Sequence, residues 1–465
     1  MRVLIAGAEV EGRLVDVRVR GGRIDDIAER FRPLPDEEVV DARGGALLPG
    51  LHDHHVHLLA MAAADRSVVC GPPAVSDAAG LRTALRGAAR DLAPGSWVRG
   101  TGYSESVAGL PDRAALDEMV PDRPVRIQHR GGALWILNSA GLAAVADALD
   151  ETPDVERDAA GHPTGRLWRY DARLRAAIGS QPPDLAAIGA RLASYGITGV
   201  TDATPDLDET GQDLLAAAVR EGHLPQAVQV LGSMTGAPLP PGLSGGPYKI
   251  LLRDHDLPGL EQLADRIART HGGGRPVAVH CVTRESLVLT LAALEIAGRR
   301  DGDRLEHAAV VPPELCEPLA ASGLTVVTQP SFIATRGDAY LASVDPWDVE
   351  HLYPYATLLA HGVPTVPSSD APFGDPDPWR TVAAASSRRT PGGAVLGAHE
   401  RVDARVALSG FLTPLRSPAA PPRRLMPGSP ADLCLLGEPL RASLADPSAE
   451  RVTLVLRQGE PIHRR

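Results

Sequence analysis

Lysine and asparagine are almost absent from this chain of 465 residues, where Lys249 and Asn138 are the only examples of their types. Lysine and arginine together number 47, so 47 − 1 leaves 46 arginines to supply the positive charge. Codon bias in a GC-rich genome explains such a composition, and a lysine that survives it points to chemistry that arginine cannot perform. Lysine can lose its proton and react as a free amine, whereas the guanidinium stays charged. Lys249 is therefore either a chance remnant or a functional residue.

Other scarcities exclude whole classes of function. Aromatic residues make up 3% of the chain, so a core must be built from Ala, Val and Leu. No run of about 18 apolar residues exists to span a membrane, and the first residues lack the apolar region of a signal peptide. The net charge of −11 argues against a nucleic-acid partner, which needs a cationic face. The sequence thus predicts a protein that acts on a small molecule without membrane or nucleic acid.

The chain has four cysteines with no CxxC spacing: Cys70, Cys281, Cys316 and Cys434. This is too few for a disulfide framework, so we interpret them as reduced thiols in a cytoplasmic protein.

Strand-like alternation at both ends of the chain predicts one domain built from the two termini. Residues 1–48 and 406–465 are expected to form a composite β-sandwich. Residues 49–405 alternate buried-looking β runs with helical stretches, which is typical of a parallel sheet and, with this many units, of a (β/α)8 TIM barrel. The stretch from about 60 to 195 is long for one connection and predicts a lid-like insertion. The β runs are 125–127, 197–201, 227–230, 248–252, 277–280, 304–307, 325–328 and 364–367.

Histidine is concentrated in one short stretch, Pro49-Gly50-Leu51-His52-Asp53-His54-His55-Val56-His57-Leu58. Residues two apart on a strand project to the same side, so His55 and His57 can reach one metal ion together. Asp53 lies on their side of the strand. His52 and His54 project to the other side, and His54 is interpreted as a structural residue.

Three later strand ends carry residues that ligate metals. His280, His307 and Asp370 each close a buried-looking β run. In (β/α)8 barrels the chemistry comes from the C-terminal ends of the strands. Alone, each residue would more often be a satisfied polar group. Together with His55 and His57 they predict a metal site.

These motifs resemble the metal-dependent amidohydrolase superfamily, in family order and over essentially the whole chain. Within it the chain looks most like the long-insert branch, amidohydrolase family 3, which includes N-substituted formamide deformylase-like enzymes. The resemblance rests on Pro49-Gly50 to His57, Val277 to His280, Leu305-Glu306-His307-Ala308, Ser369-Asp370-Ala371-Pro372, Gly428 to Leu433, Asp122 to Val125, Trp135 to Ser139, Pro163-Thr164-Gly165 and Gly196 to Asp202. The chain departs from the branch at Gly131-Gly132-Ala133, where a histidine is usual, and at Thr283-Arg284, where Gly-Asp is usual.

The resemblance implies a role for Lys249, because several amidohydrolases carry a carboxylated lysine on the corresponding strand. In that case His55, His57, Lys249 and Asp370 hold one metal, and Lys249, His280 and His307 hold a second. Zinc suits these nitrogen and oxygen ligands, with Mn2+ or Fe2+ also compatible. The alternative is that Lys249 pairs with a carboxylate such as Asp254.

The expected reaction is hydrolysis of an amide, formamide or cyclic amide C–N bond by a metal-activated hydroxide. Asp370 would accept the water proton and pass it to the leaving nitrogen. Substrate contacts are expected from the lid, at Tyr103, Arg130, Trp135, Trp168 and Arg169. Either arginine could bind a substrate carboxylate or simply be a surface residue.

Other functions stay open at this point. A one-metal site of His55, His57, His280 and Asp370, assisted by His307, also fits a deaminase or another C–N lyase. Released ammonia would distinguish deamination from amide hydrolysis. A metal-free assembly scaffold is a third interpretation, although every expected ligand is present. The resemblance also suggests a homodimer.

Overall fold

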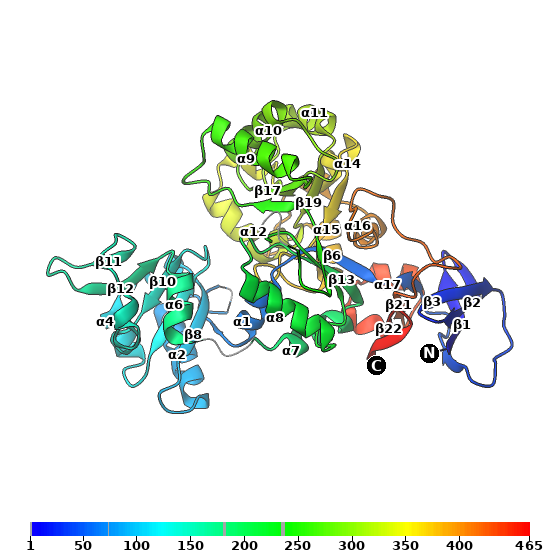
Figure 1. Ribbon diagram of the computed structural model, residues 1–465, viewed down its shortest axis with the longest axis horizontal. Coiled ribbons are helices and arrows are strands. Elements are labelled where there is room, and N and C mark those ends of the chain that lie inside the picture. The colour runs from blue at the N-terminus through cyan, green and yellow to red at the C-terminus, as the bar shows by residue number, and fades with distance from the viewer. Residues whose placement is uncertain (1, 73, 180–182, 234–237) are drawn as a thin grey trace. The chain divides into compact units, whose positions relative to one another are not determined.

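The computed structural model describes residues 2–72, 74–179, 183–233 and 238–465 (Figure 1). The chain falls into two compact units, one formed by residues 1–59 and 185–465 and the other by residues 60–184. The predicted boundaries of a separate terminal domain and of a lid stay predictions.

Two four-stranded sheets bring the ends of the chain together in the first unit (Figure 1). The N-terminal sheet has the order β3-β2-β1-β4, and the other has the order β23-β22-β21-β5. One buried apolar cluster contains side chains from both sheets, among them Ile5, Val17, Leu433 and Leu454. The strands are β1 (Arg2–Val10), β2 (Arg13–Arg20), β3 (Arg23–Ala28), β4 (Glu38–Asp41), β5 (Leu47–Pro49), β21 (Leu433–Leu436), β22 (Val452–Arg457) and β23 (Glu460–Arg464).

Two parallel sheets hold the residues of the predicted site. One has the order β15-β14-β13-β6 and the other β16-β17-β18-β19-β20. Runs such as Val277–Val279 are fully buried, as expected for parallel strands covered on both faces. The strands are β6 (Leu51–Val56), β13 (Ile197–Asp202), β14 (Ala227–Val230), β15 (Leu243–Gly245), β16 (Tyr248–Ile250), β17 (Val277–Cys281), β18 (Arg304–His307), β19 (Thr325–Thr328) and β20 (Thr365–Pro367).

Backbone hydrogen bonds link the two parallel sheets at both ends of the series. The amide of Asp370, after β20, donates to the carbonyl of His55 at 2.9 Å, and the amide of His57 donates to Ala371 at 2.8 Å. On the other side the amide of Lys249 in β16 donates to Leu231, just after β14, at 3.1 Å. The predicted α/β class is therefore confirmed, although the parallel strands of the described residues fall into two sheets and not one.

Helices alternate with these strands, as the sequence predicts for βα units. The helix α1 (Leu58–Asp65) follows β6 and continues into the second unit. The other helices of the first unit are α7 (Leu185–Ser194), α8 (Glu209–Arg220), α9 (Leu260–Gly272), α10 (Arg284–Ala297), α11 (Pro313–Ser322), α12 (Ser331–Ser343), α13 (Pro346–Val349), α14 (Tyr355–Ala360), α15 (Pro378–Ser387), α16 (Ala404–Phe411) and α17 (Leu440–Ala445).

The second unit has a six-stranded sheet of its own, in the order β11-β12-β10-β9-β8-β7. Its strands are β7 (Val68–Val69), β8 (Val98–Tyr103), β9 (Val125–His129), β10 (Leu134–Leu137), β11 (Val155–Arg157) and β12 (Pro163–Trp168). Its helices after α1 are α2 (Ala78–Asp91), α3 (Glu105–Ala108), α4 (Arg113–Met119), α5 (Ser139–Ala144) and α6 (Asp171–Ile178).

One predicted barrel strand proves to belong to this second sheet. The run at 125–127 is β9, which pairs parallel with β8 and antiparallel with β10 in the six-stranded sheet, so grouping it with the strands of the predicted barrel was wrong. Its apolar pattern is that of any buried strand, and a pattern of burial does not specify which sheet the strand joins. Asn138, the only asparagine, caps α5 and accepts a hydrogen bond from Gly141 at 2.8 Å.

Among the described residues, no helix has the length and apolar character needed to cross a membrane. All four cysteines are buried and free, as predicted.

Candidate metal centre

The strand β6 presents histidines on both of its faces. His55 lies within the strand and is buried, and His57 follows directly after its end. The side chains approach each other edge to face, with ring centroids 5.3 Å apart. The predicted pairing of these two histidines on one side of the chain is thus present in the structure.

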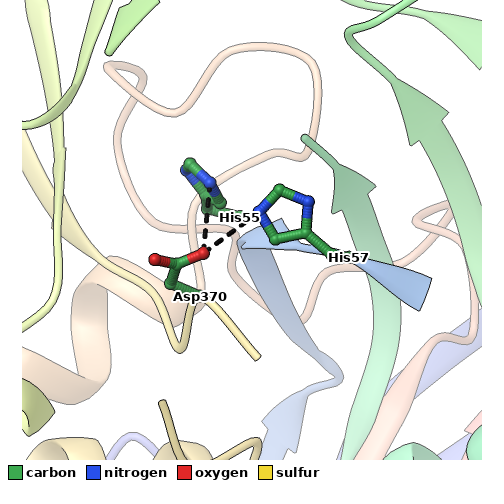
Figure 2. Close-up of side chains that lie close together, drawn as sticks. All are labelled: His55, His57 and Asp370. Carbon is green, nitrogen blue, oxygen red and sulfur yellow. Dashed lines mark ion pairs between the residues drawn. The ribbon is translucent and has the colours of Figure 1, made fainter. Parts of the chain in front are cut away.

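Asp370 joins the two histidines at a single carboxylate oxygen (Figure 2). Its Oδ1 atom lies 3.4 Å from Nε2 of His55 and 3.1 Å from Nε2 of His57. One ligand atom from each of the three residues lies within 4.8 Å of the others, which is close enough for one metal ion to contact all three. Figure 2 shows both imidazoles directed toward the same carboxylate.

The other two predicted histidines extend this cluster. The ring of His307 lies 5.0 Å from that of His55, and its Nδ1 atom lies 3.9 Å from Oδ2 of Asp370. The ring of His280, at the end of β17, lies 4.5 Å from that of His307. His55, His57, His280, His307 and Asp370 therefore form one continuous group of side chains.

Unusual backbone conformations place two members of the group. His307 has φ = 73° and Asp370 has φ = 54°, both in the left-handed region that non-glycine residues rarely adopt. His307 is the last residue of β18, and Asp370 follows β20 after Ser368 and Ser369. Such strain persists only where the surroundings impose it, and it is concentrated at functional sites.

Lys249 is buried in β16 beside the group and has no hydrogen-bond partner for its Nζ atom. Burial lowers the pKa of Lys249, although Glu306 and Asp370 act in the opposite direction. The alternative of a salt bridge to Asp254 is not present among the described residues. The Asp254 carboxylate accepts a hydrogen bond from Thr283 Oγ1 at 2.6 Å instead. An unpaired buried amine next to carboxylates is unusual for a structural lysine.

Glu306 also lies in this group, although the sequence motif that contains it gave it no predicted role. Its side chain is fully buried in β18, and its Oε2 atom accepts a hydrogen bond from Nδ1 of His55. Its Oε1 atom accepts from Nε of Arg304 at 2.5 Å. The available signal was the spacing of Arg304 and Glu306, because two opposite charges two residues apart share one face of a buried strand.

The protons on His55 follow from these contacts. Burial and the nearby Lys249 lower the pKa of His55 to about 3, so the ring is neutral at pH 7. Burial raises the pKa of Glu306, but Arg304, Lys249 and His55 lower it by more, so Glu306 is ionised. A carboxylate can only accept, so the single ring proton is on Nδ1 and Nε2 carries a lone pair.

This lone pair faces another acceptor. Burial raises the pKa of Asp370, whereas His55 and His57 lower it by more, so Asp370 is also ionised. Its Oδ1 atom is buried, 3.1 Å from Nε2 of His57 and 3.4 Å from the unprotonated Nε2 of His55. Two facing acceptors in a buried site repel each other unless a proton or a metal cation lies between them, and nitrogen and carboxylate donors suit a divalent metal.

The remaining histidines of β6 face a different part of the unit. His52 Nδ1 donates to the carbonyl of Thr413 at 2.9 Å, and His54 Nε2 donates to the Thr413 hydroxyl at 2.8 Å. Neither belongs to the group around Asp370, as expected for His54. Asp53 accepts hydrogen bonds from the amides of His55 and Ser369, both at 3.2 Å, and thereby fixes the backbone on both sides of the cluster.

The predicted substrate contacts all lie in the second unit. Tyr103 and Trp135 are buried in its core, where Tyr103 donates to the carbonyl of Gly109 and Trp135 donates to Asp171, both at 2.8 Å. The exposed residues are Arg130, Trp168 and Arg169, of which Arg169 pairs with Asp154 at 2.5 Å. A role of these five in substrate binding stays a prediction.

Comparison with known proteins identifies relatives over nearly the whole chain. The sequence model of the amidohydrolase family matches residues 38–463. N-substituted formamide deformylase of Arthrobacter pascens is 27% identical over 460 residues, covering 84% of this chain and 83% of that protein. The putative amidohydrolase YtcJ of Bacillus subtilis (strain 168) is 26% identical over 427 residues, covering 79% of this chain and 78% of its own length.

A solved structure supports the same relationship at the level of the fold. An uncharacterized metal-dependent hydrolase from Pyrococcus horikoshii OT3 superposes with a TM-score of 0.72 at 20% identity, and the match covers 100% of both chains.

Proposed function

Because this chain belongs to the amidohydrolase family, we propose that it is a metal-dependent hydrolase that cleaves a C–N bond of an amide, formamide or cyclic amide. One observation carries the proposal: Nε2 of His55 and Nε2 of His57 converge on the same buried Oδ1 of Asp370, at 3.4 Å and 3.1 Å, so that three ligand atoms lie close enough for one metal ion. The named activity of the relative from Arthrobacter pascens supports the bond type.

His55, His57 and Asp370 would hold a first divalent metal. His280 and His307 would contribute to a second metal site. Zinc suits all of these nitrogen and oxygen donors, and Mn2+ or Fe2+ is also compatible with them. A bound metal of this kind supplies Lewis acidity, which makes water more acidic and polarises a substrate carbonyl.

After carboxylation, Lys249 would join the residues that hold these metals. Its lowered pKa increases the fraction of neutral amine, which attacks CO2 to form a carbamate and releases one proton. The product is an anion at a buried position whose nitrogen has no hydrogen-bond partner in the unmodified side chain. Bound metal cations would balance the negative charge that this carbamate adds to that of Asp370.

Asp370 and His57 would have different roles in hydrolysis. Asp370 accepts the proton of the attacking water and delivers it to the leaving nitrogen, which a buried carboxylate at the centre of the group is placed to do. His57 is oriented by Thr204, whose Oγ1 atom lies 3.2 Å from its Nδ1 atom. Of the five proposed substrate contacts, Arg130, Trp168 and Arg169 are exposed and available to a ligand, whereas Tyr103 and Trp135 are buried in the core of the second unit.

We also infer that the parallel strands form a (β/α)8 barrel and that the two terminal sheets form a β-sandwich. The hydrogen bonds from Asp370 to His55 and from Lys249 to Leu231 support closure of the barrel. The apolar cluster shared by the terminal sheets supports the sandwich. Barrel closure would place all the site residues at one end of the strands.

The experiment is a product assay on zinc-loaded protein with a panel of N-substituted formamides, linear amides and cyclic amides. Release of a carboxylate together with an amine supports the proposal, and Asp370→Asn should abolish it. Release of ammonia from an amino-substituted heterocycle, with no amide cleaved, would replace the proposal with a deaminase. The exposed Asp403→Asn serves as the matched control, because asparagine also caps α16.

A further inference from the structure

Glu306 is a buried carboxylate whose two oxygens are both occupied. Oε1 accepts from Nε of Arg304 at 2.5 Å, and Oε2 accepts from Nδ1 of His55. A buried charge is costly unless it is paired and hydrogen-bonded, so this arrangement needs both partners. Rotation of the Glu306 carboxylate would therefore break at least one of these two hydrogen bonds.

Arg304 anchors this carboxylate to the backbone of β6. Its Nη2 atom donates to the carbonyl of His54 at 3.0 Å, one residue before His55. Arg304 and Glu306 lie two residues apart in β18 and thus share a face of the strand. The position of Glu306 relative to the His55 ring is consequently fixed from both strands.

His307 has an equivalent partner of a different chemical type. Its Nδ1 atom lies 2.6 Å from Oε1 of Gln329. The orientation of the Gln329 amide is set by its nitrogen, which donates to the carbonyl of Val327 at 3.2 Å and to Ser368 Oγ at 2.9 Å. Oε1 is then the acceptor, and the proton of His307 is on Nδ1.

His57 lacks such a partner. Its Nδ1 atom contacts Oγ1 of Thr204 at 3.2 Å, and a hydroxyl can donate or accept. Thr204 therefore orients the ring of His57 without selecting a tautomer. His55 and His307 thus have partners that select a tautomer and His57 does not, so His57 serves as an internal control for the effect of such a partner.

We propose that Glu306, held by Arg304, is a positioning residue that keeps His55 in the tautomer protonated on Nδ1, and that Gln329 does the same for His307. Both rings then present an unprotonated Nε2 before a metal binds, so no proton has to move within the ring for the metal to enter. This inference rests on the proposed metal-dependent function, which it deepens.

The sharpest variant is Glu306→Gln. Arg304 Nε can only donate, so it would keep the amide oxygen of the new side chain as its acceptor, and the amide NH2 would then face Nδ1 of His55. An NH2 group can only donate, so His55 would switch its proton to Nε2 and block its ligand atom. We expect metal affinity to fall by about 10- to 100-fold, the range typical for partners of metal-bound histidines.

Two matched variants separate positioning from general disruption. Glu209→Gln makes the same substitution at an exposed residue of α8, outside the group, and should keep the metal affinity of the wild type. Thr204→Val removes a partner that selects no tautomer and should have a smaller effect than Glu306→Gln. Metal affinity is measured for each purified protein by competition with a chromophoric zinc chelator at fixed pH.

A second readout does not depend on metal or activity. Proton–nitrogen correlation spectra of 15N-histidine-labelled, metal-free protein report the tautomer of each ring, and His55→Gln assigns the His55 signals. The proposal predicts Nδ1–H for His55 in the wild type and Nε2–H in Glu306→Gln. A wild-type ring protonated on Nε2, or an unchanged zinc affinity in a folded Glu306→Gln protein, would overturn it.

The same pair of measurements distinguishes this inference from the proposed function. If the wild-type protein binds no metal, the metal-dependent function fails, and the tautomer spectra still decide the role of Glu306. If Glu306→Gln does not fold, the wild-type spectrum alone gives the decisive tautomer.

Discussion

The Nε2 atom of His57 lies 3.1 Å from Oδ1 of Asp370, the same oxygen that lies 3.4 Å from Nε2 of His55. One carboxylate oxygen thus faces two imidazole nitrogens, one contributed by β6 and the other by the residue that follows it. The backbone enforces the arrangement, because the Asp370 amide donates to His55 and the His57 amide donates to Ala371. A metal ion bound at this shared oxygen would contact both histidines and Asp370.

Asp370→Asn keeps the size of the side chain and removes its charge and its ability to accept a proton. Loss of a general acid–base group typically costs about 10²- to 10⁴-fold, so we expect kcat/KM to fall by at least that range. Steady-state hydrolysis of the best amide substrate measures it. A variant that retains full activity would show that Asp370 does not take part in proton transfer.

Lys249→Ala removes the only lysine of the sequence and with it the amine that we propose to be carboxylated. Wild-type protein grown with bicarbonate should lose the mass of one CO2 per chain on acidification, and the variant should not. Added acetate should partly restore activity to Lys249→Ala, because a free carboxylate can occupy the vacated space. Lys249→Arg, which leaves no such space, should not respond to acetate. Equal activity of wild type and Lys249→Ala would make Lys249 a remnant.

Because His54 is buried, we expect the folded protein to lose stability in mild acid. Burial lowers its pKa in the folded protein to about 3, from an ordinary value of 6.5. Between these two values the unfolded chain binds the extra proton, so the free energy of unfolding falls as pH decreases below about 6.5. One such group lowers the free energy of unfolding by about 1.4 kcal/mol for each pH unit between these two values.

The variant His54→Gln tests this contribution, since glutamine can still donate to Thr413. The urea midpoint of the wild type should fall between pH 7 and pH 5 by more than that of the variant. Parallel pH profiles of the two proteins would show that His54 is not held neutral by the fold.

Gly232→Ala should disturb the segment that orients His57. A methyl group at this position would lie 1.8 Å from the carbonyl oxygen of Thr204, so the backbone must move. Overpacking of this kind costs about 1–3 kcal/mol, and the thermal midpoint should fall accordingly. Gly272→Ala in α9 meets nothing within 4 Å and serves as the control. Similar midpoints for the two variants would contradict this account of the turn.

The sequence singled out the ligand-type residues because each lies in or just after a strand, where alternation and a polar residue after an apolar run are visible; that they bind metal stays a prediction. His55, His57, His280, His307 and Asp370 are gathered in one group in the structure. Glu306 and Gln329 were not assigned, because their role depends on which atom of a neighbouring strand they meet. Strand 125–127 was assigned to the wrong sheet for the same reason: local pattern reports burial and not the identity of the partner strand.

The central claim is that His55, His57 and Asp370 bind a catalytic divalent metal, and metal content per chain tests it most directly. Wild-type protein expressed with zinc and bicarbonate, His55→Ala, His57→Ala and the exposed-site control His223→Ala would be purified alike and analysed by inductively coupled plasma mass spectrometry. The account predicts tightly held metal in the wild type and His223→Ala, and its clear loss in the other two. Equal metal in all four proteins, or none in the wild type, would contradict it.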